Sequence, residues 1–151
     1  MPSGAKDAEE LRSMRMSKTG LTQEDYTGLA EFRYLIRCFL EFSENEAKRA
    51  GLTPRHHQAI LVIKGYGRGK PITVGDLAER LKIRHNTAVE LANRLVENGL
   101  VERIQDSADQ RRVLLQLTPE AERHLAALSS AHRDELSRIK PMLEQVLQRY
   151  S

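Results

Sequence analysis

The chain has 151 residues, of which 40% are hydrophobic and 30% are charged, and it carries one cysteine, Cys38. This length predicts a single domain that folds without disulfides or metal ions, and the hydrophobic content excludes a disordered chain. With 24 Lys and Arg against 21 Asp and Glu, the net charge of +3 is too small to indicate nucleic-acid binding by itself.

Neither a membrane segment nor a secretion signal is expected. The longest wholly apolar run, residues 59–63, is far shorter than the roughly 20 residues of a membrane helix. Residues 1–20 form a polar extension without the apolar core of a signal peptide, and a short helix over residues 7–16 is expected within it. A single cysteine fits a reducing compartment, so we expect a cytoplasmic protein that makes no membrane contact.

A long amphipathic helix is predicted after this extension. Thr22 and Asp25 form a capping-box pattern, and Gly51 follows as a helix stop. Apolar or small residues repeat at three- and four-residue spacing at Leu29, Phe32, Ile36, Phe39, Leu40, Ser43, Ala47 and Ala50. A helix of about 28 residues is about 42 Å long and exceeds the roughly 30 Å of a small domain. Part of it must therefore pack outside its own globule.

Three shorter helices follow in the next part of the chain. Thr53 and Pro54 begin one that runs to about residue 65, and a loop rich in Gly and Pro covers residues 65–71. Thr73 with Asp76 begins a second helix, and residues 86–98 form a third after a four-residue break. The last two have the lengths and separation of a helix-turn-helix, which many helical bundles share.

Two β-prone runs, residues 100–105 and 113–117, come directly after this helix pair. The polar loop 106–112 between them predicts a hairpin with a long basic tip. A helix-turn-helix followed by such a hairpin is a winged helix, so the fold class expected is mainly α with a small β-hairpin wing. A last helical segment begins at Thr118, and Pro141 predicts a kink or a new helix within it.

Several short patterns have an ordinary structural interpretation beside a functional one. Asp109 and Arg111 in the loop tip are typical of a solvated turn, although an arginine there can enter a minor groove. His56 and His57 point about 100° apart on a helix and cannot chelate one metal ion; core, capping or dimer contacts are the alternative to a role in an effector cavity. The sequence shows no catalytic constellation and no phosphate loop, so we expect no enzyme, no cofactor and no metal.

The order and spacing of four segments resemble the multiple antibiotic resistance regulator (MarR) family of winged-helix transcription factors. The segments are GLTPRHHQAILVI at 51–63, TVGDLAERL at 73–81, NRLVENGLVER at 93–103 and DSADQRRVLLQLTPEA at 106–121. The resemblance implies a single domain over residues 21–151, with dimerisation helices at 21–51 and 118–151 and a winged-helix lobe at 53–117. It also implies a homodimer that binds double-stranded DNA at a pseudo-palindromic operator, most simply as a repressor relieved by a small apolar or aromatic effector.

The resemblance assigns candidate sites to numbered residues. DNA contacts are expected from Thr73, Arg84, His85, Asn86, Thr87, Glu90, Arg94, Asp109, Arg111 and Arg112. Among these, the first helical turn from Arg84 would meet base edges, Arg94 a phosphate, and Arg111, braced by Asp109, the minor groove. Polar anchors for an effector are expected from Arg33, Arg37 and His57. Some relatives sense oxidants with a cysteine on the first helix, but nearer to the helix start than Cys38.

The charge of the DNA-contacting segment departs from what such a role favours. Residues 84–112 contain five arginines against five acidic residues, so their charges sum to zero. Attraction for phosphate must then come from the positions of these charges in the folded protein or from neighbouring cations, namely Arg55, Lys64, Arg68, Lys70, Arg80 and Lys82. This balance supports one alternative function: a winged-helix protein that acts through protein contacts and has lost DNA affinity.

Overall fold

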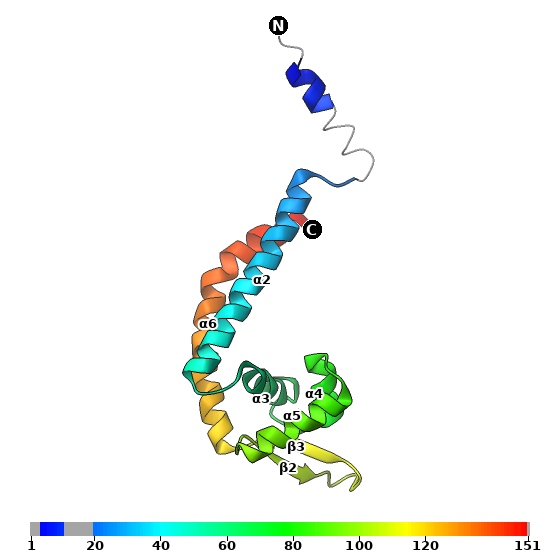
Figure 1. Ribbon diagram of the computed structural model, residues 1–151, viewed down its shortest axis with the longest axis vertical. Coiled ribbons are helices and arrows are strands. Elements are labelled where there is room, and N and C mark those ends of the chain that lie inside the picture. The colour runs from blue at the N-terminus through cyan, green and yellow to red at the C-terminus, as the bar shows by residue number, and fades with distance from the viewer. Residues whose placement is uncertain (1–3, 11–19, 151) are drawn as a thin grey trace. The chain divides into compact units, whose positions relative to one another are not determined.

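The computed structural model describes residues 4–10 and 20–150 of the chain (Figure 1). Residues 4–10 are helical, while residues 11–16 of the expected short helix lie outside the described residues. The later elements are α2 (Gln23–Arg49), α3 (Pro54–Tyr66), β1 (Ile72–Thr73), α4 (Val74–Leu81), α5 (His85–Glu97), β2 (Val101–Gln105), β3 (Val113–Leu117) and α6 (Pro119–Leu147), followed by a 3₁₀ turn, Gln148–Tyr150. The expected fold class, helical with a small hairpin wing, is confirmed.

The chain divides into two compact units that are described separately. The winged-helix unit comprises Glu41–Glu135, and the helical unit comprises Met1–Leu40 and Leu136–Ser151. The winged-helix unit is therefore larger than the predicted lobe at 53–117, because the end of α2 and the first half of α6 pack with α3. No described helix has both the length and the apolar character needed to span a membrane.

The sheet of the winged-helix unit has three antiparallel strands in the order β1-β3-β2. Val101 pairs with Leu117 and Gln105 with Val113 across the wing. The third strand, β1, was not predicted, since its two residues are too few to show an alternating pattern. One core cluster, which includes Ile60, Leu77, Leu95 and Leu115, joins α3, α4, α5, the sheet and the start of α6.

Local capping explains where several of these helices begin. The Thr53 hydroxyl accepts a hydrogen bond from His56 N–H before α3, and Pro54 occupies the first turn. At α4 the capping box is complete: the Thr73 hydroxyl accepts from Asp76 N–H, and the Asp76 carboxylate accepts from Thr73 N–H. The same reciprocal pair, Thr22 with Asp25, precedes α2. These predicted starts are confirmed.

Within the helical unit only part of the apolar stripe expected on α2 is buried: Phe32 and Phe39 are partly buried. Leu35 is 5% exposed, whereas Leu29 is 52% exposed and Leu40 48% exposed. The helix therefore carries two apolar faces, one packed within the unit and one open. Of the two alternatives expected at Pro141, a kink or a new helix, the new helix is not found, because α6 continues through this residue as one element. A proline has a φ compatible with a helix, although it removes one backbone donor and its ring crowds the preceding turn.

Candidate nucleic-acid interface

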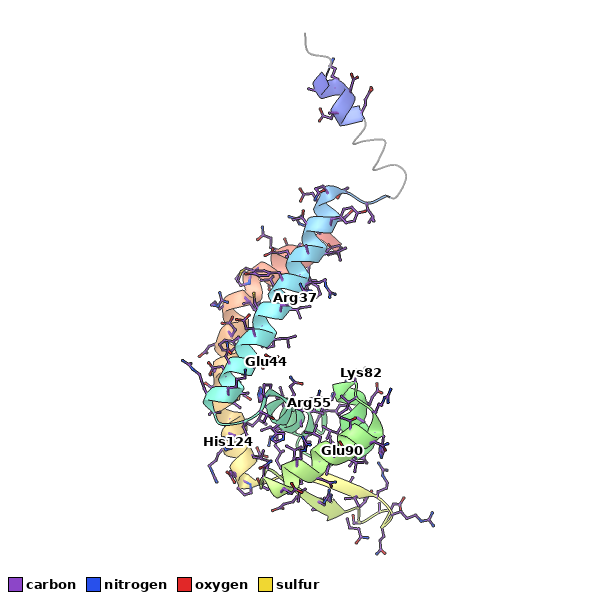
Figure 2. All side chains as sticks on the ribbon, viewed as in Figure 1. Arg37, Glu44, Arg55, Lys82, Glu90 and His124 are labelled. Carbon is purple, nitrogen blue, oxygen red and sulfur yellow. The ribbon has the colours of Figure 1, made fainter. Side chains whose placement is uncertain are left out.

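The helix-turn-helix consists of α4, a tight turn and α5. Lys82 ends α4 in the left-handed region at φ 54°, and its N–H returns to the carbonyls of Ala78 and Glu79. Leu77 and Ala78 on α4 and Leu91 and other residues on α5 are buried in the shared core. The turn therefore presents one side of α5 to solvent, and Figure 2 shows Lys82 beside this turn and Glu90 on α5.

The predicted base-contacting residues all lie on the exposed side of α5. Arg84, His85, Asn86 and Thr87 form its first turn and are exposed, and Glu90 follows one turn later. The N-cap residue Arg84 makes no side-chain capping bond, and the first turn contains no acidic residue. The α4 terminus is satisfied by its own capping box, whereas backbone N–H groups at the start of α5 have no side-chain cap and face solvent. Such N–H groups can bind phosphate oxygens.

Arg94 lies further along α5 and faces α3. Its guanidinium lies near His56, and burial of the imidazole together with the Arg94 charge lowers the pKa of His56. Arg94 also remains exposed, as a phosphate-contacting residue must be. Thr73, which was also expected to contact DNA, lies at the start of α4 and not on α5. Its hydroxyl accepts the capping hydrogen bond of α4.

The wing is anchored to α5 by a contact that sequence reasoning missed. The Arg103 guanidinium on β2 donates to the Asn93 side-chain oxygen on α5. Both residues lie in the segment at 93–103 that resembles the MarR family, yet ten positions separate them, and only the packing of β2 against α5 brings them together. This bond links the hairpin to α5.

Two aspartates shape the wing tip. The Asp106 carboxylate accepts from Ala108 N–H at 2.9 Å, and the Asp109 carboxylate accepts from Arg111 N–H at 3.0 Å. The bond from Arg111 to Asp109 thus comes from the backbone, whereas the expectation was a brace on the guanidinium. Arg111 and Arg112 are both exposed. Asp109 therefore fixes the turn on which the arginines stand.

Three of the six neighbouring cations are engaged within the protein. Lys64 pairs with Glu122 at 2.9 Å and Lys82 with Glu79 at 2.5 Å. The Arg80 guanidinium stacks over the Tyr66 ring at 3.9 Å. Exposed ion pairs of this kind are weak and can exchange for phosphate. The contribution of Arg80 on α4 and of Lys82 at its end to the electrostatic potential near α5 thus depends on how readily they leave these partners.

The expected effector anchors fall in different units. Arg33 and Arg37 are exposed on α2 in the helical unit, whereas His57 is 2% exposed in the winged-helix unit. The His57 ring lies 5.0 Å from that of His132 on α6. Burial and the neighbouring His132 lower the pKa of His57. Core packing is therefore observed for His57, and an effector role for these three residues stays a prediction.

His132 joins three helices and was not singled out as a functional residue. Its Nδ1 lies 2.7 Å from the Leu128 carbonyl oxygen, which can only accept, so Nδ1 donates. In the neutral ring Nε2 then accepts from the Ser43 hydroxyl at 2.8 Å. Phe42 meets the ring edge-on at 5.4 Å. Ser43 on α2, His57 on α3 and His132 on α6 thus form one contact in the winged-helix unit.

Comparison with known proteins identifies a family match in the winged-helix region. Residues 50–112, which include the complete helix-turn-helix and the wing tip, match the sequence model of the MarR family. This part of the chain therefore has the sequence pattern of that family. The matched region is the one in which α4, α5 and the hairpin were expected from the sequence.

Individual proteins agree with this assignment. The chain is 34% identical over 65 residues to an uncharacterized HTH-type transcriptional regulator, YsmB, of Bacillus subtilis (strain 168). This alignment covers 43% of the chain and 44% of YsmB, so it spans less than half of the relative's length.

Solved structures extend the likeness of fold beyond the matched segment. A mutant of S. aureus MepR bound to an oligodeoxyribonucleotide has a TM-score of 0.61 at 19% identity, over 83% of this chain and 98% of that one. NadR in complex with 4-hydroxyphenylacetate has a TM-score of 0.65 at 24% identity, over 79% and 84%. The MarR-type fold therefore covers the helices outside residues 50–112 as well.

Proposed function

We propose that this MarR-family chain is a homodimeric, sequence-specific DNA-binding transcription regulator that acts in the cytoplasm as a repressor and is not an enzyme. The observation that carries the proposal is the exposed face of α5, which presents His85, Asn86, Thr87 and Glu90 beside a hairpin tip with two arginines. A DNA-bound structure of the same fold, that of the MepR mutant, is consistent with this role.

The base-edge assignments follow from chemistry on that face. An Asn side chain can donate to and accept from adenine, and a Glu can accept from the cytosine amino group. Asn86 and Glu90 lie four residues apart and so share one side of α5. Arg84 is assigned to base edges with the rest of the first turn of α5, Arg94 to a phosphate, and Arg111 to the minor groove, where negative potential is concentrated.

Dimerisation is proposed on the open apolar face of the helical unit. Ten of the fourteen large hydrophobic residues found exposed among the described residues belong to this unit. On α2 and just before it they are Leu21, Tyr26, Leu29, Tyr34, Ile36 and Leu40, and on the last part of the chain they are Leu136, Met142, Leu147 and Tyr150. Such a patch on both copies favours a self-complementary two-fold interface.

An effector is the least constrained part of the proposal. NadR of the same fold is described in complex with 4-hydroxyphenylacetate. A small apolar or aromatic ligand with Arg33, Arg37 or His57 as polar anchor would act by changing the separation of two recognition helices, which must be about 34–36 Å apart to meet successive major grooves. Calorimetry with a panel of aromatic acids tests this. Absence of heat, together with unchanged operator affinity, contradicts it.

DNA binding itself is tested by selecting operator DNA from a random pool and measuring fluorescence anisotropy at two salt concentrations. Arg111→Ala should weaken binding to all operator variants alike, by about 1–3 kcal/mol, and reduce the salt slope by about one. Asn86→Ala should relax preference at particular base pairs and leave the slope nearly unchanged. Equal affinity and slope for Arg111→Ala and the parent would remove the wing from the interface.

A second function is favoured by one observation, the zero net charge of residues 84–112. A winged-helix protein that acts through protein contacts would select no DNA from the pool, and any residual affinity would vary with salt alone. Selection of a defined, two-fold symmetric sequence would exclude this alternative.

A further inference from the structure

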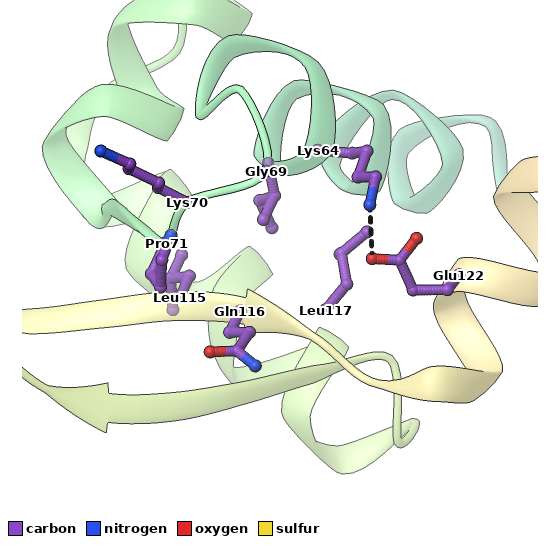
Figure 3. Close-up of a pocket in the computed structure, with 9 residues that line it drawn as sticks. Lys64, Gly69, Lys70, Pro71, Leu115, Gln116, Leu117 and Glu122 are labelled. Atoms are coloured by element: carbon purple, nitrogen blue, oxygen red, sulfur yellow. Dashed lines mark hydrogen bonds and ion pairs between the residues drawn. The ribbon is translucent and has the colours of Figure 1, made fainter.

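A pocket of about 150 Å³ opens on the winged-helix unit away from the proposed DNA-binding face. It lies between the end of α3, the loop before β1, β3 and the first turn of α6 (Figure 3). None of its lining residues belongs to α4, α5 or the hairpin tip. A cavity of this size accommodates a ligand about as large as benzene.

One wall of the pocket is the edge of β3, which the short strand β1 covers only in part. Thr118 N–H donates to the Leu100 carbonyl and Asp106 N–H to the Arg112 carbonyl, so the even-numbered residues of β3 hydrogen-bond to β2. The odd-numbered residues face β1, where Ile72 pairs with Leu115. The N–H and C=O of Leu117 consequently point to the place where Lys70 would pair if β1 were longer.

The loop before β1 supplies no backbone partner for the N–H and C=O of Leu117. Lys70 N–H donates instead to the Gly67 carbonyl at 2.9 Å. The Lys70 carbonyl also turns inward, since a Cβ on Gly67 would lie 2.2 Å from its oxygen. Leu117 therefore offers one donor and one acceptor to the pocket.

A cation and an anion stand at the same opening. Lys64 on α3 and Glu122 on α6 line the pocket, and the Lys64 ammonium donates to the Glu122 carboxylate at 2.9 Å. Their side chains are 47% and 44% exposed, so the pair is weak and can exchange partners. The Lys70 ammonium points away from this pair (Figure 3). The aliphatic side chains of Ile63, Leu115 and Leu117 complete the lining.

We propose that this pocket binds a small zwitterion, an α-amino acid with a short apolar side chain. Its carboxylate takes the two donors, the Lys64 ammonium and Leu117 N–H. Its ammonium takes the two acceptors, the Glu122 carboxylate and Leu117 C=O. One protein ion pair is replaced by two, and the net charge of the site does not change.

The same arrangement discriminates against ligands with one charge. A carboxylate alone removes Lys64 from Glu122 and leaves the Leu117 carbonyl without a partner. An amine alone leaves Lys64 and Leu117 N–H without one. Polar groups left unpaired in a site lower affinity, so both should bind more weakly than the zwitterion. The proposal does not depend on DNA binding by this chain.

The test is a titration of the full-length ¹⁵N-labelled protein with L-valine, followed by the amide resonances of Leu117 and Gly69. The two matched probes are isovalerate, which is valine without its amino group, and isobutylamine, which is valine without its carboxylate. We expect saturable shifts at Leu117 with valine and about ten-fold weaker binding of either analogue. Unchanged Leu117 resonances overturn the proposal, and equal affinity for isovalerate overturns the assignment to a zwitterion.

Variants identify the charged partners. Lys64→Met and Glu122→Gln should each weaken valine binding about five-fold, since each removes one exposed charge partner. Lys70→Met is the matched control and should bind valine like the parent, because its ammonium points away from the pair. The same spectra report that each variant is folded. Wild-type affinity in both Lys64→Met and Glu122→Gln contradicts the assignment.

Discussion

The two units of this chain differ in how completely they bury their large apolar side chains within one copy. In the winged-helix unit, short helices and strands close around one cluster, and Ile60, Leu77, Leu95 and Leu115 are completely or almost completely buried. In the helical unit, Leu35, Ile139 and Val146 are buried, yet ten large hydrophobic residues remain exposed. Two long helices have few neighbours to cover a second apolar face. The first unit can be stable as a single copy, whereas the proposed dimerisation would cover the open face of the second.

Deletion is expected to have the largest effect and to separate the units. Removing residues 124–151 also takes Leu125 and Leu128 out of the winged-helix core, so this truncation should be unfolded or aggregated. Removing residues 136–151 leaves that core intact and should give a folded winged-helix unit with an uncovered, association-prone α2. Circular dichroism and size-exclusion chromatography distinguish the two. A soluble, folded monomer from the first truncation would contradict the comparison.

A core substitution in the winged-helix unit is expected to come next in size. Leu77 is completely buried, and Leu77→Ala should lower the free energy of unfolding by about 2–5 kcal/mol through lost burial and a cavity. Because the cluster lies within one chain, this loss should not vary with protein concentration. Urea unfolding at two concentrations measures it. A strong concentration dependence of the change would mean that the unit is not self-sufficient.

A charge introduced on the open apolar face of the helical unit should weaken the proposed dimerisation. Leu29→Glu introduces an unpaired charge into the proposed two-fold interface once from each copy. The dimer dissociation constant should rise at least about 100-fold, roughly 2.7 kcal/mol. Leu61→Glu is the control, since Leu61 is 45% exposed on the other unit and Leu29 is 52% exposed. Sedimentation velocity should show monomers for Leu29→Glu alone; dimers of both variants would place the interface elsewhere.

The parts predictable from the sequence are those governed by neighbours along the chain. Caps at Thr22, Thr53 and Thr73 and the lengths of α4 and α5 follow from local hydrogen bonds and periodicity. The buried face of α2 was not predictable, because Leu29 and Leu35 are equally apolar and only tertiary packing separates them.

Contacts between different helices and strands could not be predicted from the sequence either. The bond between Arg103 and Asn93 depends on how β2 packs against α5, and the strand β1 is defined only by its pairing with β3. The exposed residues of the interface were identified because the family resemblance assigned them positions. The pocket beneath the β3 edge has no sequence signature, since its polar groups are backbone atoms.

The smallest expected effect concerns the one buried polar residue in the winged-helix core, His57. Burial and the nearby His132 lower its pKa in the folded protein below the ordinary value of 6.5. The unfolded chain therefore binds a proton more readily than the folded one between the lowered pKa and 6.5. This contribution to stability is complete above about pH 6.5 and is lost as the pH falls toward the folded pKa.

His57→Phe removes the titrating group, so urea unfolding at pH 7.5 and 5.5 should show a smaller loss of stability in the variant than in the parent. The lowered pKa of His56 acts in the same direction in both proteins and cancels in this comparison. An equal loss in variant and parent would show that His57 does not bind its proton differently on folding.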